Sequence, residues 1–148
     1  MSRIEIVGIR ELENTIRKMG NVAIKHVRAA AIKGMKKPMP QARKDAPHDE
    51  GNLRRGIKLL PLKGNRRTRQ LYRTYFDPKM NKIFQNEYGG YYPVHQEYGW
   101  VAENGRIIPG QMFITNAYND QEETVEKTIT DELTKRLEGE INKGGLKP

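Results

Sequence analysis

The side chains that most often do chemistry are few and scattered in this sequence. It contains no cysteine, which excludes thiol nucleophiles, thiolate metal sites and disulfides, and its only serine is Ser2, at a terminus where a nucleophile is hard to position. Three histidines, His26, His48 and His95, lie far apart, and none has a partner at i+3 or i+4 to form a helical metal pair. His95 and Glu97 would share one face of a strand, but no third ligand stands beside them. We therefore expect structural roles for these histidines.

The acidic clusters are also explained without catalysis. Asp49 and Glu50 fall in a predicted turn, where Asp is a common cap, and the acids at 122–126 fall in the first turns of a predicted helix, where they favour its dipole. The pair Gly89-Gly90 is followed by aromatic residues rather than by a helix start with lysine, so it is no phosphate loop. The sequence therefore predicts a protein that is not an enzyme and has no catalytic, cofactor-binding or metal-binding residues.

Charge is distributed unevenly along the chain. The net charge is +9, but residues 1–80 carry 20 Lys/Arg against 7 Asp/Glu, whereas residues 81–148 carry 7 against 11. Between 51 and 76 there are eight basic residues and no acid. Such asymmetry suits either nucleic-acid contact or head-to-tail packing, in which the basic hairpin of one subunit meets the acidic C-terminal helix of the next. The candidates for an interface or a DNA channel are Arg66, Arg67, Arg69 and Arg73.

Hydrophobic periodicity predicts helices at both ends of the chain. Residues 3–7 alternate as a short strand, 9–19 carry a helical stripe, and a second helix from about residue 24 ends or kinks near Lys37 because Pro38 and Pro40 lack amide donors. Residues 41–44 can then resume it. Over 116–142, apolar residues recur at every fourth position, which predicts a long helix that must lie on a sheet or on another subunit. These residues are Val125, Ile129, Leu133, Leu137 and Ile141.

The middle of the chain is expected to form an antiparallel sheet. Residues 57–62 and 66–76 indicate a long basic hairpin, and 82–85 and 91–98 are expected to add further strands. Six of the eleven aromatic residues lie between 84 and 100, a cluster typical of either a core or an interface. The prediction is one α+β domain spanning 1–148, with the sheet packed against two N-terminal helices and one long C-terminal helix. No apolar run is long enough for a membrane span, and we expect synthesis in the cytoplasm.

Three segments, in this order, resemble one known family. They are APHDEGNLRRGI at 46–57, YPVHQEYG at 92–99 and PGQMFITNAY at 109–118. They are similar to the tail-completion, or head-to-tail joining, neck proteins of long non-contractile-tailed bacteriophages and prophages. The chain departs from the family's usual residues at Glu50, Gly56, Pro93 and Trp100.

The resemblance implies a structural virion protein. Such a protein would form a homo-oligomeric, hexameric ring at the head–tail interface, contact other tail or head-completion proteins, and surround a channel through which genomic DNA passes. It would be located in the virion, and in the host cytoplasm during assembly, with no cofactor and no membrane contact. The alternative is a basic, sequence-independent DNA-binding protein.

Five residues are expected to be structural. Gly51 can adopt a positive φ and so turn the chain within 49–52, and Gly99 can do the same after Glu97. Glu97 lies beside the second turn, and Arg54 and Arg55 follow the first. We expect Glu97 to pair with Arg54 or Arg55, the alternative being that it is a solvated strand residue.

Overall fold

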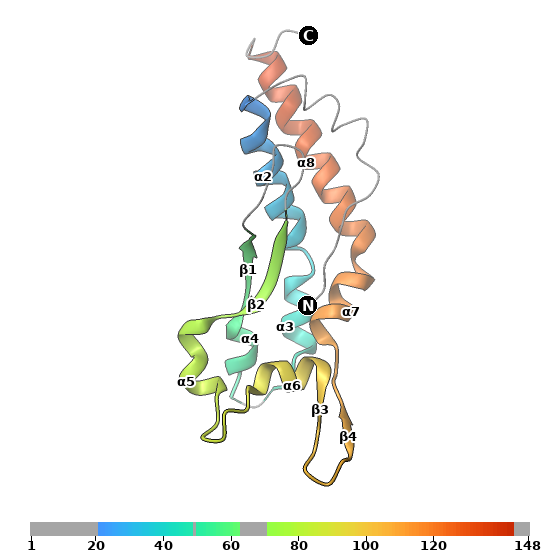
Figure 1. Ribbon diagram of the computed structural model, residues 1–148. Coiled ribbons are helices and arrows are strands. Elements are labelled where there is room, and N and C mark those ends of the chain that lie inside the picture. The colour runs from blue at the N-terminus through green and yellow to red at the C-terminus, as the bar shows by residue number, and fades with distance from the viewer. Residues whose placement is uncertain (1–20, 49, 63–70, 144–148) are drawn as a thin grey trace.

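The computed structural model describes residues 21–48, 50–62 and 71–143, and the fold is α+β (Figure 1). The predicted strand at 3–7, the predicted helix at 9–19 and the hairpin tip at 63–70 lie outside these residues. In chain order the elements are α2 (Asn21–Met35), α3 (Met39–Asp45), α4 (Asn52–Gly56), β1 (Ile57–Pro61), β2 (Tyr72–Phe76), the 3-10 helix η1 (Pro78–Met80), α5 (Asn81–Phe84), α6 (Tyr92–Tyr98), β3 (Gly99–Val101), β4 (Ile107–Pro109), α7 (Phe113–Asp120) and α8 (Glu122–Asn142).

Helices α2 and α8 form a long pair that makes up one end of the molecule (Figure 1). Polar contacts link His26 to Glu140 and Lys33 to Glu132, so the two helices run antiparallel. The helices approach closely because α2 presents small residues: a Cβ on Gly34 would lie 2.3 Å from a side-chain carbon of Ile129. The fourth-residue stripe of α8 is buried against this face, as the periodicity predicted. The buried members are Val125, Ile129, Leu133 and Leu137.

The two prolines interrupt the second helix as expected. Helix α2 ends at Met35, a turn occupies 36–38, and α3 begins at Met39 with Pro38 at its N-cap and Pro40 in its first turn. Proline is tolerated at this position because the first-turn amides have no partner within the helix. The break lets α3 leave the α8 axis and pack on α7.

The predicted hairpin is present, with Ile57 of β1 opposite Phe76 of β2 in an antiparallel ladder. Its inward face carries Tyr72, Thr74 and Phe76. Thr74 donates a hydrogen bond to the hydroxyl of Tyr118 on α7, and Tyr72 and Phe76 pack against the main core. Arg73 lies on the other face and is exposed. The two faces of β2 therefore differ in their contacts, as side chains that alternate along a strand do.

The two further strands were wrongly predicted, because 81–84 and 92–98 are the helices α5 and α6. Pro93 occupies the first turn of α6, Gly99 follows its last residue with φ 83°, and the buried positions Pro93 and Glu97 are one helical turn apart. Proline just inside the start and glycine just past the end are helix signals that outweigh the strand propensity of tyrosine and valine. The described residues therefore form two separate two-stranded sheets, β1-β2 and β3-β4, rather than one larger sheet.

The predicted C-terminal helix is two helices, divided at Gln121. Its long part, α8, packs along α2 rather than on the predicted sheet, whereas the short α7 packs on α3. Neither proline nor glycine occurs near Gln121 to mark this division.

Candidate interaction surface

The exposed apolar side chains gather at one end of the molecule. Ten large hydrophobic residues are exposed among those described, and nine of them belong to 83–112, the end opposite the α2–α8 tips (Figure 1). We call these nine the apolar end: Ile83, Tyr88, Tyr92, Val94, Tyr98, Trp100, Val101, Ile107 and Met112. The aromatic cluster therefore divides, since Phe84 is buried in the protein while Tyr88, Tyr92, Tyr98 and Trp100 face solvent.

The most exposed apolar pair lies on a projecting hairpin, residues 99–110, which we call the arm (Figure 1). Val101 is paired with Ile107 across β3 and β4, and the two side chains are 67% and 75% exposed. Trp100 and Ile108 form the pair on the opposite face, where the Trp100 ring lies 5.7 Å from the ring of His95 on α6. One face of the arm thus packs toward the protein, and the other presents two β-branched side chains to solvent.

The tip of the arm is a well-bonded turn. The amide of Gly105 donates to the carbonyl of Ala102, the amide of Ala102 donates to the carbonyl of Arg106, and the Asn104 side chain accepts from the Arg106 amide. Gly105 has φ 77°, a left-handed conformation that glycine adopts without strain. The turn therefore holds the charged side chains of Glu103 and Arg106 at the end of a defined structure.

Glu97 fixes the root of the arm. Its side chain is 1% exposed, and its carboxylate accepts hydrogen bonds from the amide of Ile114 at 2.9 Å, the amide of Thr115 at 2.9 Å and the hydroxyl of Thr115 at 2.8 Å. These amides open helix α7, where unpaired N–H groups and the helix dipole favour a negative charge. The backbone carbonyl of Glu97 also accepts the amide of Met112 at 2.9 Å. One residue thus joins α6, the arm and α7.

Two glycines allow the strands of the arm to cross closely at this root. A Cβ on Gly99 would lie 2.2 Å from the Ile108 carbonyl oxygen, and a Cβ on Gly110 would lie 2.3 Å from the Glu97 carbonyl oxygen. Gly99 also has φ 83° and ψ −177°, a region that essentially only glycine occupies. The arm is therefore held by backbone contacts that any side chain would disrupt.

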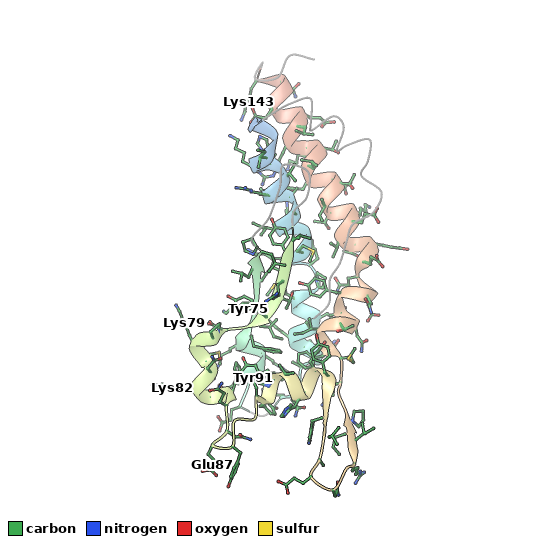
Figure 2. The ribbon with its side chains drawn as sticks, in the orientation of Figure 1. Tyr75, Lys79, Lys82, Glu87, Tyr91 and Lys143 are labelled. Atoms are coloured by element: carbon green, nitrogen blue, oxygen red, sulfur yellow. The ribbon has the colours of Figure 1, made fainter. Side chains whose placement is uncertain are left out.

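A half-open pocket of about 290 Å³ lies on the other side of α6. Its lining is mixed: Leu53 and Phe84 are buried, Ile83 is exposed, and Glu50 and Asn52 contribute polar side chains. Tyr92, at the start of α6, also lines it. Figure 2 shows Lys79, Lys82 and Glu87 on this side of the molecule, apart from the arm. The pocket and the arm thus lie beyond opposite ends of one short helix.

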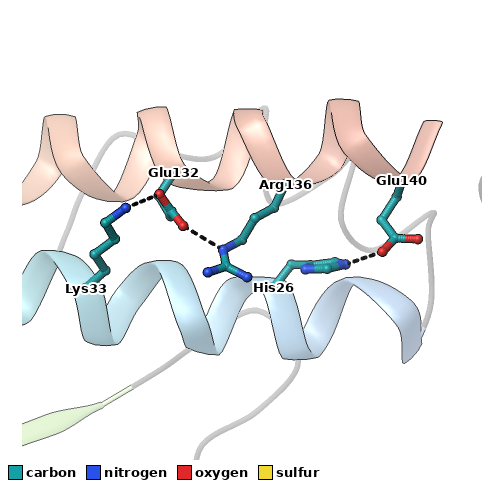
Figure 3. A network of polar contacts seen from close by, with 5 residues as sticks. All are labelled: His26, Lys33, Glu132, Arg136 and Glu140. Carbon is teal, nitrogen blue, oxygen red and sulfur yellow. Dashed lines mark hydrogen bonds and ion pairs between the residues drawn. The ribbon is translucent and has the colours of Figure 1, made fainter. Parts of the chain in front are cut away.

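A polar network occupies the far end of the molecule, between α2 and α8 (Figure 3). Glu132 accepts from Lys33 at 2.5 Å and from Arg136 at 2.9 Å. The hydrogen bond from Lys33, followed by that from Arg136, lowers the pKa of the Glu132 carboxyl. His26 lies 3.0 Å from Glu140. These contacts hold the two helices together. They also give Glu132 and Glu140, two of the acidic residues of α8, partners within the same chain.

The predicted site residues separate into three groups. Gly51, with φ 76°, and Gly99 have the positive φ that was predicted for them. Arg73 is exposed on β2, whereas Arg66, Arg67 and Arg69 lie outside the described residues.

The predicted ion pair of Glu97 with Arg54 or Arg55 is wrong. Arg54 donates to the carbonyls of Lys44 and Ala46, Arg55 donates to the side chain of Asn52, and Glu97 is taken up entirely by α7. Nor is Glu97 a solvated strand residue, since it is buried on a helix. Backbone amides at a helix start can satisfy a buried carboxylate as a guanidinium does. The positions of charged residues in the sequence do not reveal such amides.

Sequence reasoning named Glu97 as structural but missed the arm and the partners of Glu97 on α7. Asn104-Gly105 lies between short apolar runs and is a strong hairpin signal that could have been found. Thr115 and Gly110 gave no separate signal, because their role depends on the contact between α6 and α7.

Among the described residues, no group of three or more His, Cys, Asp or Glu could hold a metal ion. No helix in the same part of the chain is both long and apolar enough to cross a membrane. No protein-family model, curated protein or solved structure matches the chain.

Proposed function

We propose that this chain is a structural subunit of a homo-oligomeric ring at the head–tail junction of a tailed bacteriophage. The observation that carries the proposal is the apolar end, where nine of the ten exposed large hydrophobic side chains of the described residues gather. Apolar and aromatic residues concentrated on one region of a polar protein are typical of an assembly surface. A surface of this kind fits a protein that acts by binding copies of itself and neighbouring virion proteins.

The amount of core also supports assembly. Hydrophobic residues are 36% of the sequence, below the roughly 45 to 50% of an average domain. The two-stranded arm projects from the body and buries little of its own outer face, whereas a two-stranded hairpin alone is at best marginally stable in water. Covering the arm by a neighbouring subunit would supply the missing burial, since binding to the folded state stabilises it.

The phage assignment rests on the three segments that resemble neck proteins. Two of them, 92–99 and 109–118, are joined by the contacts of Glu97 with Ile114 and Thr115 and by the close approach of Gly99 and Gly110. The residues that carry the resemblance therefore form one structural joint, which makes a chance likeness of separate segments less plausible. By this resemblance the ring is hexameric, surrounds the DNA channel and contacts other tail or head-completion proteins.

Native mass spectrometry of the purified chain tests the assembly part of the proposal. We expect one closed oligomer with a single copy number, and a ring in electron micrographs of the same sample. A chain that stays monomeric at high concentration, both alone and with purified phage tails, contradicts the proposal.

Sequence-independent DNA binding remains the second candidate, because the hairpin and the helices before it are basic and Arg73 is exposed. Duplex binding should then weaken steeply with salt. The logarithm of the binding constant should fall linearly with the logarithm of the salt concentration, with a slope set by the number of phosphates neutralised. Replacing Arg66, Arg67 and Arg69 by glutamate should reduce this binding. Tight, salt-dependent binding by a chain that forms no ring would favour this alternative over the ring subunit.

A further inference from the structure

We infer that the arm of one subunit inserts into the pocket of a second copy, so that the ring closes by head-to-tail arm–pocket contacts. This inference rests on the proposed function and names the surfaces that make its subunit contact. It commits to one occupant for the pocket, which is the outward face and tip of the arm, residues 101–107, of the neighbouring chain.

The arm and the pocket both expose apolar side chains. The arm offers the paired side chains of Val101 and Ile107, which are 67% and 75% exposed. The pocket, of about 290 Å³, offers the exposed side chains of Ile83 and Tyr92 beside its polar residues. A compact β-branched side chain on a rigid turn is a suitable anchor for such a pocket, since little conformational entropy is lost when it becomes buried.

The charges match as well. The arm carries Arg106 beside its apolar pair, and the pocket carries Glu50, whose carboxylate accepts from the side-chain amide of Asn52 at 3.2 Å. Arg106 of the arm and Glu50 of the pocket thus have opposite charges, and such a pair fixes the orientation of docking more than its affinity.

The arm of the same chain cannot reach the pocket. The pocket includes Tyr92 at the start of α6, and the arm begins at Gly99 directly after its end, about 10 Å away along the helix. The arm cannot fold back across α6, because Glu97, Gly99 and Gly110 fix its root. Two different surfaces on one rigid body give a heterologous contact, which produces a closed ring when the rotation between copies closes.

The absence of native cysteine allows a clean cross-linking test. Full-length chains carrying Ile107→Cys are mixed with affinity-tagged chains carrying Ile83→Cys, and the mixture is oxidised. Both positions are exposed, so both variants should fold. We expect disulfide-linked dimers containing one chain of each kind, and little dimer from either variant alone.

Charge reversal provides a second readout. Arg106→Glu should weaken self-association about fivefold, the range of an exposed ion pair, and adding Glu50→Arg should restore it. Efficient cross-linking of Ile107→Cys chains with each other would instead indicate a two-fold arm–arm contact and overturn the inference. An oligomer with neither mixed cross-links nor charge rescue also overturns it while leaving the ring proposal intact. A chain that never associates would contradict both the ring proposal and the arm–pocket contact.

Discussion

Thr115 donates two hydrogen bonds to the buried carboxylate of Glu97, from its amide at 2.9 Å and from its hydroxyl at 2.8 Å. Together with the amide of Ile114, these donors tie α6 to the start of α7 across the arm. The arm's position therefore depends on a single side chain that no solvent reaches.

Glu97→Gln should destabilise the protein by about 3 kcal/mol. The amide side chain retains one acceptor oxygen but turns an NH₂ group toward donors, and buried hydrogen bonds to a charged group contribute about 1.5 to 3 kcal/mol each. Chemical denaturation measures the loss. The matched control is Glu103→Gln in the exposed turn of the arm, expected within about 0.5 kcal/mol of wild type. Equal stability of the two variants would show that Glu97 is not the anchor.

Gly99→Ala and Gly105→Ala should differ sharply although both glycines have a positive φ. At Gly99 the new Cβ meets the Ile108 carbonyl and the backbone lies in a glycine-only region, so we expect a loss of about 3 kcal/mol or more. At Gly105 no atom lies within 4 Å of the Cβ position, and only the conformational cost of about 1 kcal/mol applies. Thermal unfolding of both variants distinguishes them. Similar losses would contradict the close crossing at the root.

The contrast between the arm and the helix pair explains what the sequence could predict. The stripe from Val125 to Leu137 and the break at Pro38 depend on neighbours in the chain, so periodicity and proline chemistry found them. The root of the arm depends on a carboxylate and amides seventeen residues apart, and its glycines matter only once the strands cross. The positions of charged residues suggested arginine partners for Glu97, because backbone amides at a helix start carry no charged side chain that would mark them as partners. Strand propensity also misled for α6, although Pro93 and Gly99 marked its ends.

Tyr118→Phe should cost about 2 kcal/mol. The Tyr118 hydroxyl donates to the carbonyl of Met35 at 2.8 Å and accepts from Thr74 at 2.7 Å, so its removal leaves two sheltered groups without this partner. The lost contacts join α7 to the end of α2 and to the hairpin. Tyr88→Phe is the matched control, because that side chain is 88% exposed and should unfold as wild type does. A denaturant midpoint unchanged by Tyr118→Phe would contradict the link.

Stability should fall in acid partly through Glu132. Its pKa is lowered in the folded protein, first by the hydrogen bond from Lys33, so the folded state binds fewer protons than the unfolded state near the usual Glu pKa of about 4.3. The contribution is therefore present above that pH and is lost as the pH falls through the lowered folded value. Glu132→Gln should show a smaller loss of stability than wild type between about pH 6 and pH 3. Glu138→Gln, exposed on the same helix, should follow wild type. Parallel curves for wild type and Glu132→Gln would exclude the effect.

Light scattering of two matched double variants tests whether the apolar end makes the subunit contact. Val101→Asp with Ile107→Asp places two charges on the arm, whereas Thr130→Asp with Thr134→Asp places two on the exposed side of α8. Both should fold, because all four positions are exposed. We expect the arm variant to stay monomeric at concentrations where wild type and the α8 variant form the same oligomer. An arm variant that assembles as wild type does would contradict it.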